Sequence, residues 1–413
     1  MKFAIITHAS HKLKENTIFS YEPYVREMNL WIPHASEVKI VAPIAAEVIT
    51  NIDTNYIHNN IGIISITAFD MLSIKGSLKT MWFLPRIAYS IYKSMLWADH
   101  IHLRCPGNIG LIGCFVQILF PNKPKTAKYA GNWDPKAKQP WSYRLQKWLL
   151  SNTFLTKNMK VLIYGEWTNQ TKNIAPFFTA SYSEREIANN YRHPEPSSGF
   201  HDISRHPELV SGSHVVELDK QMLKQVQHDE MLKQVLHDGI LNFIFVGALT
   251  KGKRPLLSAE VIQKLKEKGH KVHLDIYGDG LEHSVLEQYI EANELGNAVI
   301  LHGNCDKETI KKAYQNAHFL LFISVSEGWP KVVAEAMFWG CLPITSKVSC
   351  IPYMLANGER GALVNANADE IVAVVAAYLQ HPEKYVEQTK KAMEWSRQFT
   401  MEKFDYEIGK LLG

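Results

Sequence analysis

The chain has 413 residues, which is long for a single hydrophobic core, so two domains are expected. Hydrophobic residues make up 46% and charged residues 21%, close to the averages of soluble globular proteins. The net charge of +4 conceals an asymmetry, because residues 1–193 carry 22 Lys and Arg against 12 Asp and Glu while the remainder is net acidic. A basic first half indicates an anionic partner such as a membrane surface, with a simple solvated basic face as the alternative. Without a nucleic-acid-binding motif no nucleic acid is expected.

The sequence shows no pattern of a membrane span, an export signal or a cysteine framework. No apolar run reaches the roughly 18 residues of a transmembrane helix, and the longest, residues 109–120, is typical of a buried helix. The first ten residues, MKFAIITHAS, lack a signal-peptide cleavage site and predict a buried strand. Five cysteines form no Cys-x-x-Cys pair, so neither disulfides nor a zinc site are indicated. We expect a cytoplasmic protein, at the inner face of the membrane if its basic half meets lipid.

The first half alternates short β-branched runs with amphipathic stretches, which predicts a parallel, doubly wound sheet. Strands are predicted at residues 3–8, 38–42, 63–68, 100–103, 126–129, 161–164 and 178–182. Helices are predicted at residues 23–31, 77–97, 109–120 and 141–150. The helix at 77–97 mixes aromatic residues with Lys79, Arg86 and Lys93, which permits interfacial membrane contact. Pro85 interrupts that pattern, and ordinary core packing is the alternative.

Residues 194–240 are polar and rich in histidine, and they contain a tandem repeat, MLKQVQHDE followed by MLKQVLHDG. The offset of nine residues turns the second copy to the opposite side of a helix, so no single apolar stripe runs through both. We interpret this stretch as a flexible linker with an inserted repeat. Its His-Asp pairs are possible metal ligands by residue type, but nothing in the sequence fixes their geometry.

The second half repeats the strand–helix alternation. Strands are predicted at residues 242–246, 272–277, 299–301, 319–323 and 342–345, each followed by a helical segment. The whole chain is therefore predicted to be an α/β protein with two Rossmann-like domains facing a central cleft.

The segment EGWPKVVAEAMFWGCLP places two glutamates, Glu327 and Glu335, at the start of an apolar helix. Pro330 suits the first turn of this helix, which is predicted to run over residues 331–339 and to end before Gly340. The free N–H groups at its start favour an anion. Because carboxylates accept hydrogen bonds from sugar hydroxyls, this helix start with its two glutamates describes a nucleotide-sugar pocket.

Two other interpretations of these glutamates are open. They can form the acid/base pair of a hydrolase, although no second acidic motif supports one. They can also be structural, with one glutamate capping the helix and the other facing solvent.

SEGWPKVVAEAMFWGCLPI closely resembles the E-x7-E signature of the family 4 retaining glycosyltransferases, which have the GT-B fold. The resemblance extends over about 170 residues of the second half. Other segments that match the family's motifs in order are FIFVGALTKGKRP, DIYGDG, VILHG, VSCIPYML, NGERGALV and the final FTMEKFDYEIGKLL.

The resemblance implies roles for individual residues. Glu335 would accept from ribose hydroxyls, Glu327 would hold the donor sugar, and Lys253 would neutralise the diphosphate leaving group. Glu327 and Lys253 are thus the implied catalytic residues. The implied donor-binding set comprises Gly247, Lys253, Arg254, Gly278, Gly303, Glu327, Gly328, Trp329, Pro330, Lys331, Val332 and Glu335. Neither a metal nor a cofactor is expected, because fixed cations and helix dipoles serve the diphosphate.

The sequence departs from the family in both halves. Ala248 replaces an arginine that would contact phosphate, for which Arg254 can substitute, and Ser349 stands where a glycine is usual. In the first half the match is weak, and the acceptor-side residues it suggests are His102, Arg104, Asn132 and Trp133. Lys128 and Arg144 are further candidates for contact with an anionic acceptor.

The resemblance implies a retaining glycosyltransferase that uses a nucleoside-diphosphate sugar and a saccharide or lipid-linked acceptor in cell-surface polysaccharide or lipopolysaccharide biosynthesis. A GT-B epimerase and a catalytically impaired nucleotide-sugar-binding protein are the alternatives. The expected organisation is an acceptor domain at 1–193, the linker at 194–240, and a donor domain at 241–396. A closing helix at 397–413 is expected to pack back on the first domain.

Overall fold

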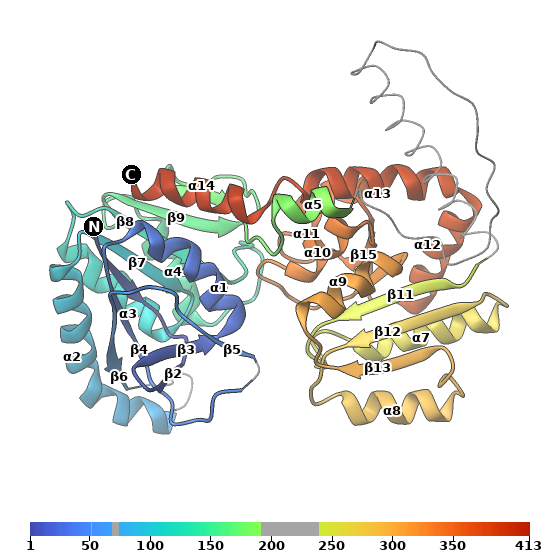
Figure 1. Ribbon diagram of the computed structural model, residues 1–413, viewed down its shortest axis with the longest axis horizontal. Coiled ribbons are helices and arrows are strands. Elements are labelled where there is room, and N and C mark those ends of the chain that lie inside the picture. Colours follow the sequence, from blue (N-terminus) through green and yellow to red (C-terminus); the bar gives the residue numbers. More distant parts are fainter. Residues whose placement is uncertain (51, 68–73, 191–238) are drawn as a thin grey trace, which may run out of the picture.

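The computed structural model describes residues 1–50, 52–67, 74–190 and 239–413, and shows two α/β domains side by side (Figure 1). Each domain has a central parallel sheet with helices on both faces. The predicted fold class of two Rossmann-like domains is confirmed. The inserted linker and its His-Asp pairs lie outside the described residues.

The sheet of the first domain has seven parallel strands in the order β10-β9-β8-β7-β1-β4-β6. They are β1 (Lys2–Ile6), β4 (Glu37–Pro43), β6 (Ile61–Ile66), β7 (His100–Cys105), β8 (Lys125–Tyr129), β9 (Met159–Tyr164) and β10 (Ile174–Phe177). Side chains alternate between the two faces of a strand. Phe3 and Ile5 of β1 therefore join one apolar core, while Ala4 and Ile6 join the other.

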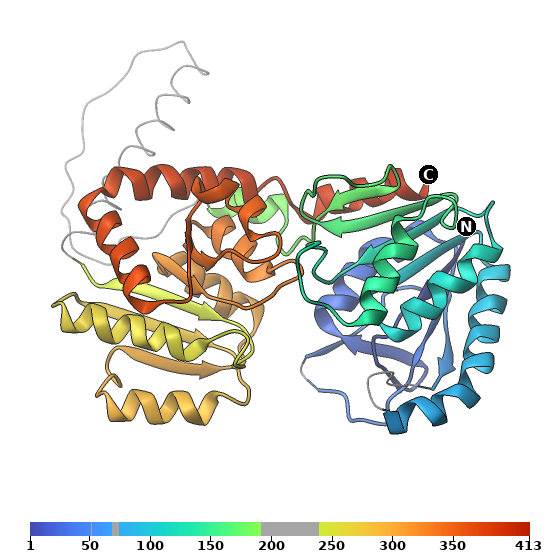
Figure 2. The ribbon, with the colours of Figure 1, turned by 180° about the vertical axis from the view of Figure 1, so that it is seen from behind.

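Helices cover both faces of this sheet. On one face lie α2 (Ile74–Trp97), α3 (Asn108–Val116) and α4 (Trp141–Ser151), which turn toward the viewer in Figure 2. On the other face lie α1 (Glu22–Trp31) and the last helix of the chain, α14 (Met401–Leu412). The chain therefore ends against the domain in which it begins.

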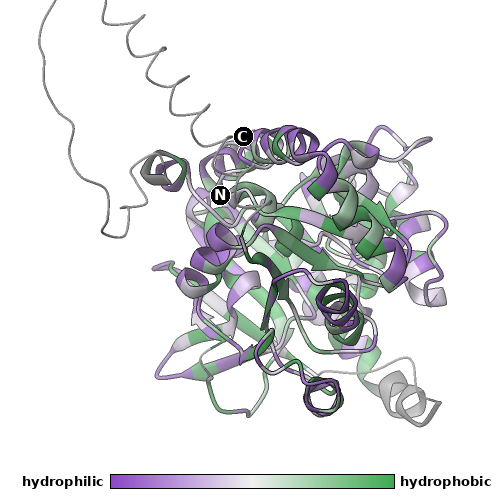
Figure 3. Ribbon diagram, turned by 90° about the vertical axis from the view of Figure 1, so that its right-hand side faces the viewer, coloured by the Kyte–Doolittle hydropathy of each residue, from purple (hydrophilic) through white to green (hydrophobic). Residues whose placement is uncertain are grey.

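The sheet of the second domain has six parallel strands in the order β13-β12-β11-β14-β15-β16. They are β11 (Leu241–Val246), β12 (Val272–Tyr277), β13 (Val299–Gly303), β14 (Phe319–Phe322), β15 (Leu342–Ser346) and β16 (Ala362–Val364). The central strands are mainly hydrophobic and the surrounding helices and loops carry most of the hydrophilic positions (Figure 3). Burial of both faces explains the nearly continuous apolar runs of β11 and β14.

The second domain's helices also form two layers. One layer contains α7 (Pro255–Glu267), α8 (His283–Ala292) and α12 (Ala368–Gln380). The other contains α9 (Lys307–Asn316) and α10 (Lys331–Trp339), with α13 (Pro382–Ser396) beside α10. As predicted, α10 ends at Gly340, which adopts the left-handed conformation with φ 87°.

Two chain crossings join the domains. The first runs from β10 into α5 (Glu184–Asn190), and the second runs from α13 into α14. They contact each other, since the Met401 N–H donates to the Tyr182 carbonyl at 3.0 Å and the rings of Phe178 and Phe399 lie 4.8 Å apart. The apolar core around these crossings includes residues of both domains.

The structure differs from the predicted elements at several places. The strand predicted at 178–182 is wrong: β10 ends at Phe177, and the following aromatic residues form the interdomain crossing. The helix predicted at 77–97 is present as α2, which begins three residues earlier and continues through Pro85. A small antiparallel sheet of β2 (His11–Lys14), β3 (Thr17–Tyr21) and β5 (Asp53–Asn55) was not predicted. In the described part of the chain, no helix is both long and apolar enough to cross a membrane.

Candidate functional site

The carboxyl ends of both sheets carry the residues that the sequence singles out. In the second domain, the strand order reverses between β11 and β14, and a ligand binds preferentially outside the strand ends at such a point. The loop after β11 carries Lys253 and the loop after β14 carries Glu327. These loops are joined by a hydrogen bond from the Val325 N–H to the Gly252 carbonyl at 2.9 Å.

Glu327 and Lys253 are brought together at this point. The Oε1 atom of Glu327 accepts from the Lys253 ammonium group and from the Ser324 hydroxyl. The Glu327 side chain is 10% exposed and that of Lys253 is 27% exposed, so a ligand can reach the lysine more readily. The Lys253 ammonium group also lies over the Phe322 ring, 4.8 Å from its centroid.

Ser349, where the sequence departs from the family, supports the same loop. Its hydroxyl accepts from the Glu327 N–H at 2.9 Å. Ser349 has φ 53°, in the left-handed region that favours glycine. The serine therefore keeps the backbone conformation of a glycine and adds a hydrogen bond to the glutamate loop.

Three predicted donor-binding glycines stand at neighbouring strand ends. The Gly247 N–H donates to the Tyr277 carbonyl at 2.9 Å, and the Gly278 N–H donates to the Gly303 carbonyl at 2.7 Å. Gly278 has φ 132°, and a β-carbon at this position would overlap the carbonyl oxygen of Gly247. Close backbone packing beside the strand-order switch point therefore requires a glycine at position 278.

The start of α10 lies directly after Glu327. Pro330 is its N-cap residue, and Lys331 and Val332 begin the helix. The Trp329 side chain is 8% exposed and packs against Tyr164 and Trp395. Arg254 is the N-cap residue of α7, with φ 52°.

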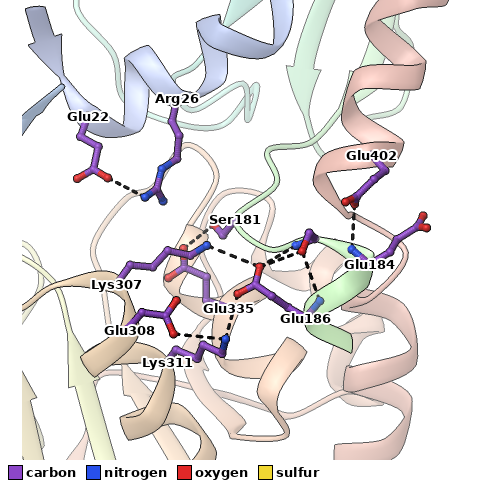
Figure 4. A network of polar contacts seen from close by, with 11 residues as sticks. Glu22, Arg26, Ser181, Glu184, Glu186, Lys307, Glu308, Lys311, Glu335 and Glu402 are labelled. Atoms are coloured by element: carbon purple, nitrogen blue, oxygen red, sulfur yellow. Dashed lines mark hydrogen bonds and ion pairs between the residues drawn. The ribbon is translucent and has the colours of Figure 1, made fainter. Parts of the chain in front are cut away.

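Glu335 lies further along α10 and faces the first interdomain crossing. Its Oε1 atom accepts from the Ser181 hydroxyl at 2.6 Å (Figure 4). In the same network, Lys311 of α9 forms an ion pair with Glu186 of α5 at 3.2 Å, and Lys307 lies 3.9 Å from Glu186. A small cavity here is lined by Ser181, Lys331 and Glu335.

Across the cleft, Arg104 at the end of β7 forms an ion pair with Glu27 of α1. Burial alone would raise the pKa of Glu27, but Arg104, Lys128 and Lys331 lower it to about 2. Lys331 belongs to the second domain, so this buried carboxylate interacts with cations of both domains. Burial lowers the pKa of Lys331, and Glu27 and Glu335 counteract this.

The glutamate loop also touches the first domain directly. The Asn132 amide donates to the Ser326 hydroxyl at 3.1 Å. A β-carbon on Gly328 would lie 2.6 Å from the Ala130 carbonyl oxygen. The loop after β8 and the loop after β14 are therefore in contact across the cleft.

Four suggested acceptor-side or anion-contacting residues lie elsewhere, which corrects their assignment. His102 is fully buried between Phe3 and Trp31, and its Nδ1 atom is 2.9 Å from the Thr126 hydroxyl. Trp133 is 4% exposed and donates to Gln170 at 2.9 Å. Lys128 is buried and donates to the Phe178 carbonyl at 2.9 Å. Arg144 is exposed on α4. Only Arg104 and Asn132 remain at the cleft.

Glu27, Ser181, Ser324 and Lys307 are site residues that the sequence did not reveal. One signal was present for Glu27, because Tyr24, Glu27, Met28 and Trp31 share one helix face by their spacing. A carboxylate on an otherwise apolar face indicates a buried partner. The described residues contain no group of three or more His, Cys, Asp or Glu arranged to hold a metal.

Part of the chain is similar in sequence to known proteins. Residues 228–395 match the model of the glycosyl transferases group 1 family. The gpi3 subunit of the phosphatidylinositol N-acetylglucosaminyltransferase of Schizosaccharomyces pombe is 27% identical over 165 residues, 38% of this chain and 35% of that protein. The aligned region thus spans about a third of that relative.

Solved structures extend the likeness to the whole chain. Anabaena HepE in complex with UDP and glucose superimposes with a TM-score of 0.62 at 13% identity, covering 99% of this chain and 98% of HepE. WaaG, a glycosyltransferase involved in lipopolysaccharide biosynthesis, gives a TM-score of 0.59 at 11% identity and covers 99% of each chain. The second half of the chain thus matches a glycosyltransferase family model, and the whole chain has the GT-B fold of these structures.

Proposed function

We propose that this protein is a retaining glycosyltransferase that moves a sugar from a nucleoside-diphosphate donor to an acceptor bound in the interdomain cleft. The observation that carries the proposal is the pairing of Lys253 with Glu327 at the start of α10. A cation, a carboxylate and free helix N–H groups at a strand-order switch point suit a phosphate joined to a hydroxyl-rich sugar. The family match and the fold support a glycosyltransferase that uses a nucleoside-diphosphate sugar.

In this proposal, the donor diphosphate lies at the start of α10 and beside Lys253. Lys253 then stabilises the charge that develops on the diphosphate when its bond to the sugar breaks. The acceptor hydroxyl forms the new bond to the anomeric carbon from the face that the diphosphate leaves, and its proton passes to the leaving phosphate. Positive charge from Lys253 and from the start of α10 stabilises the diphosphate, so the proposed reaction does not need a metal.

The two glutamates hold the donor's hydroxyl groups. Glu327 pairs with Lys253 in the unliganded protein. Donor binding redirects the lysine to phosphate and leaves the carboxylate to accept from the sugar. Glu335 exchanges its hydrogen bond with Ser181 for ribose hydroxyls.

The acceptor binds on the side of the first domain, between Arg104 and Asn132. We propose a saccharide or lipid-linked acceptor used in cell-surface polysaccharide or lipopolysaccharide biosynthesis at the cytoplasmic face of the membrane. The basic charge of residues 1–193 supports peripheral contact with anionic lipid.

A thermal-shift screen with UDP-, GDP- and ADP-sugars tests donor binding. A donor at about 100 times its dissociation constant stabilises the folded protein by about 2.7 kcal/mol, so one nucleotide class should raise the melting temperature clearly. Lys253→Ala should reduce this shift, and Lys271→Ala, an exposed lysine of the same domain, should not. No shift with any sugar nucleotide would contradict the proposal.

The stereochemistry needs a separate measurement. NMR of the product formed with the selected donor should show the anomeric configuration of the donor. An inverted product would refute retention, and donor binding without turnover by any tested acceptor would favour an impaired binding protein.

A further inference from the structure

The helix layer formed by α2, α3 and α4 displays regular stripes of apolar and basic side chains to solvent. On α2, Arg86, Tyr89, Lys93 and Leu96 are exposed at spacings of three and four residues, which places them on one helix face. Tyr89 is 59% exposed and Leu96 is 53% exposed. The opposite face of α2, with Ile87, Ile91 and Met95, is buried in the core.

The stripes continue on the neighbouring helices. On α4, Trp141, Arg144 and Trp148 follow the same spacing, with Trp148 58% exposed. The loop that follows exposes Phe154 at 75%, and the Lys157 ammonium group lies 5.4 Å from the centroid of its ring. Because α3 contacts both α2 and α4, these positions belong to one continuous layer (Figure 2).

This layer lacks negative charge. The helices α2, α3 and α4 contain no Asp or Glu at all. Between residues 83 and 165 seven Lys and Arg are exposed, against one exposed acidic residue, Asp99; the basic residues are Arg86, Lys93, Lys136, Lys138, Arg144, Lys157 and Lys160. An ordinary solvated surface mixes both signs, so this one-sided charge favours an anionic partner.

The layer adjoins the cleft through the loop after β8. Asn132 of this loop contacts Ser326 of the second domain, and the same loop continues directly into Trp141 at the start of α4. The Lys147 ammonium group of α4 donates to the carbonyl of Asp134 in this loop at 3.2 Å. A surface that binds to this layer is therefore close to the acceptor side of the cleft.

We propose that the exposed face of α2, α3 and α4, with the loop at Phe154, is the surface by which this protein docks on an anionic phospholipid bilayer. This deepens the proposed membrane contact by naming the face that makes it. Aromatic rings and leucines enter the headgroup region while lysines and arginines contact lipid phosphates. A protein partner fits less well, because lysine is depleted in the cores of protein interfaces.

Co-sedimentation of the full chain with lipid vesicles tests the docking face. The protein should bind vesicles of phosphatidylcholine mixed with phosphatidylglycerol and not those of phosphatidylcholine alone. At a contribution of about 1 kcal/mol per basic residue, Arg144→Glu/Lys157→Glu should weaken the partition at least about tenfold. Trp148→Ser/Phe154→Ser should weaken it as well and leave the preference for anionic lipid intact.

Matched substitutions on the second domain serve as controls. Leu281→Ser, at a position that is 92% exposed, and Lys384→Glu should leave vesicle binding unchanged. The thermal shift by a sugar nucleotide should be the same in all variants, so donor binding and lipid docking are judged separately. The docking proposal is overturned if the folded chain does not bind anionic vesicles or if the first-domain variants bind them as strongly as the wild type. It is equally overturned if these variants instead abolish a dimer in solution.

Discussion

At the residue scale, Glu335 is the carboxylate whose role is most directly testable. It accepts a hydrogen bond from Ser181 and lies on the same helix as the start of the proposed diphosphate site. Loss of a charge-assisted hydrogen bond to ribose costs at least about 1.5 kcal/mol. Glu335→Ala should therefore weaken nucleotide-sugar binding at least about tenfold in calorimetry.

A neighbouring glutamate provides the control for Glu335. Glu308 of α9 contributes to the same network through an ion pair with Lys311 at 3.5 Å, and its own side chain is 66% exposed. Glu308→Ala should leave donor affinity within about twofold of the wild type, as expected of an exposed ion pair. Equal affinities of Glu335→Ala and the wild type would remove Glu335 from the nucleotide site.

Lys128 predicts a pH dependence of stability. Burial lowers its pKa from 10.5 to about 7, and its ammonium group lies between the rings of Tyr164 and Phe177. Between about pH 7 and pH 10 the unfolded chain holds a proton that the folded protein has released, so the free energy of unfolding rises with pH. The melting temperature should rise in this window.

The variant Lys128→Met should flatten that rise, because one titrating group contributes up to about 1.4 kcal/mol per pH unit. Lys125 and Lys147, whose pKa burial lowers to about 8, should retain part of the slope. Lys172→Met, at an exposed lysine of the same domain, serves as the reference. Parallel melting curves against pH for Lys128→Met and wild type would show that Lys128 does not titrate in this window.

The sequence could identify the donor-side residues but few of their partners. Glu327 and Lys253 stand in motifs with fixed spacing, and the structure brings them together. The partners Ser181, Glu27 and Lys307 come from distant segments, and only the packing of the two domains places them near the site. His102 was misassigned because a strand-end histidine has the same local pattern whether it faces a cleft or the core.

At the element scale, the glycine at the end of β12 is required by the neighbouring strand end. Gly278→Ala would force a β-carbon onto the Gly247 carbonyl, at a φ of 132° that other residues rarely adopt. We expect a destabilisation of at least about 2 kcal/mol, visible as a lower first transition in calorimetry. Gly296→Ala in the same domain, with no atom within 4 Å, should change the transition little. Equal transitions in the two variants would contradict the packing argument.

The strands of the parallel sheets were largely predictable from their short apolar runs. The runs in β1, β11 and β14 are nearly continuous because helices cover both sides of each sheet. The aromatic run after β10 has the same composition but packs between the two domains, so composition alone extended the strand too far. The β2–β3 hairpin turns at Glu15 and Asn16, which adopt positive φ without the usual glycine signal.

At the scale of the whole molecule, two crossings and two facing loops hold the domains together. The crossings carry the aromatic contacts between Phe178, Phe399 and Phe404. At the cleft, the loops meet through Asn132 and Ser326 and through the close approach of Gly328 to Ala130. The crossings form an apolar contact between the domains, and the loops set the separation of the two strand edges between which the proposed transfer occurs.

Gly328→Ala tests whether this separation matters. A β-carbon 2.6 Å from the Ala130 carbonyl oxygen must displace one backbone loop from the other, because neither atom belongs to a flexible side chain. Misplacement of donor and acceptor by about 1 Å can cost up to about 100-fold in rate, so kcat should fall at least about tenfold. Donor affinity should change less, since Lys253 and Glu335 remain in place on the second domain. The control Gly62→Ala, an exposed position with no atom within 4 Å, should retain wild-type kcat. An unchanged kcat in Gly328→Ala, with the melting temperature also unchanged, would mean that the domains are not fixed at this distance during the reaction.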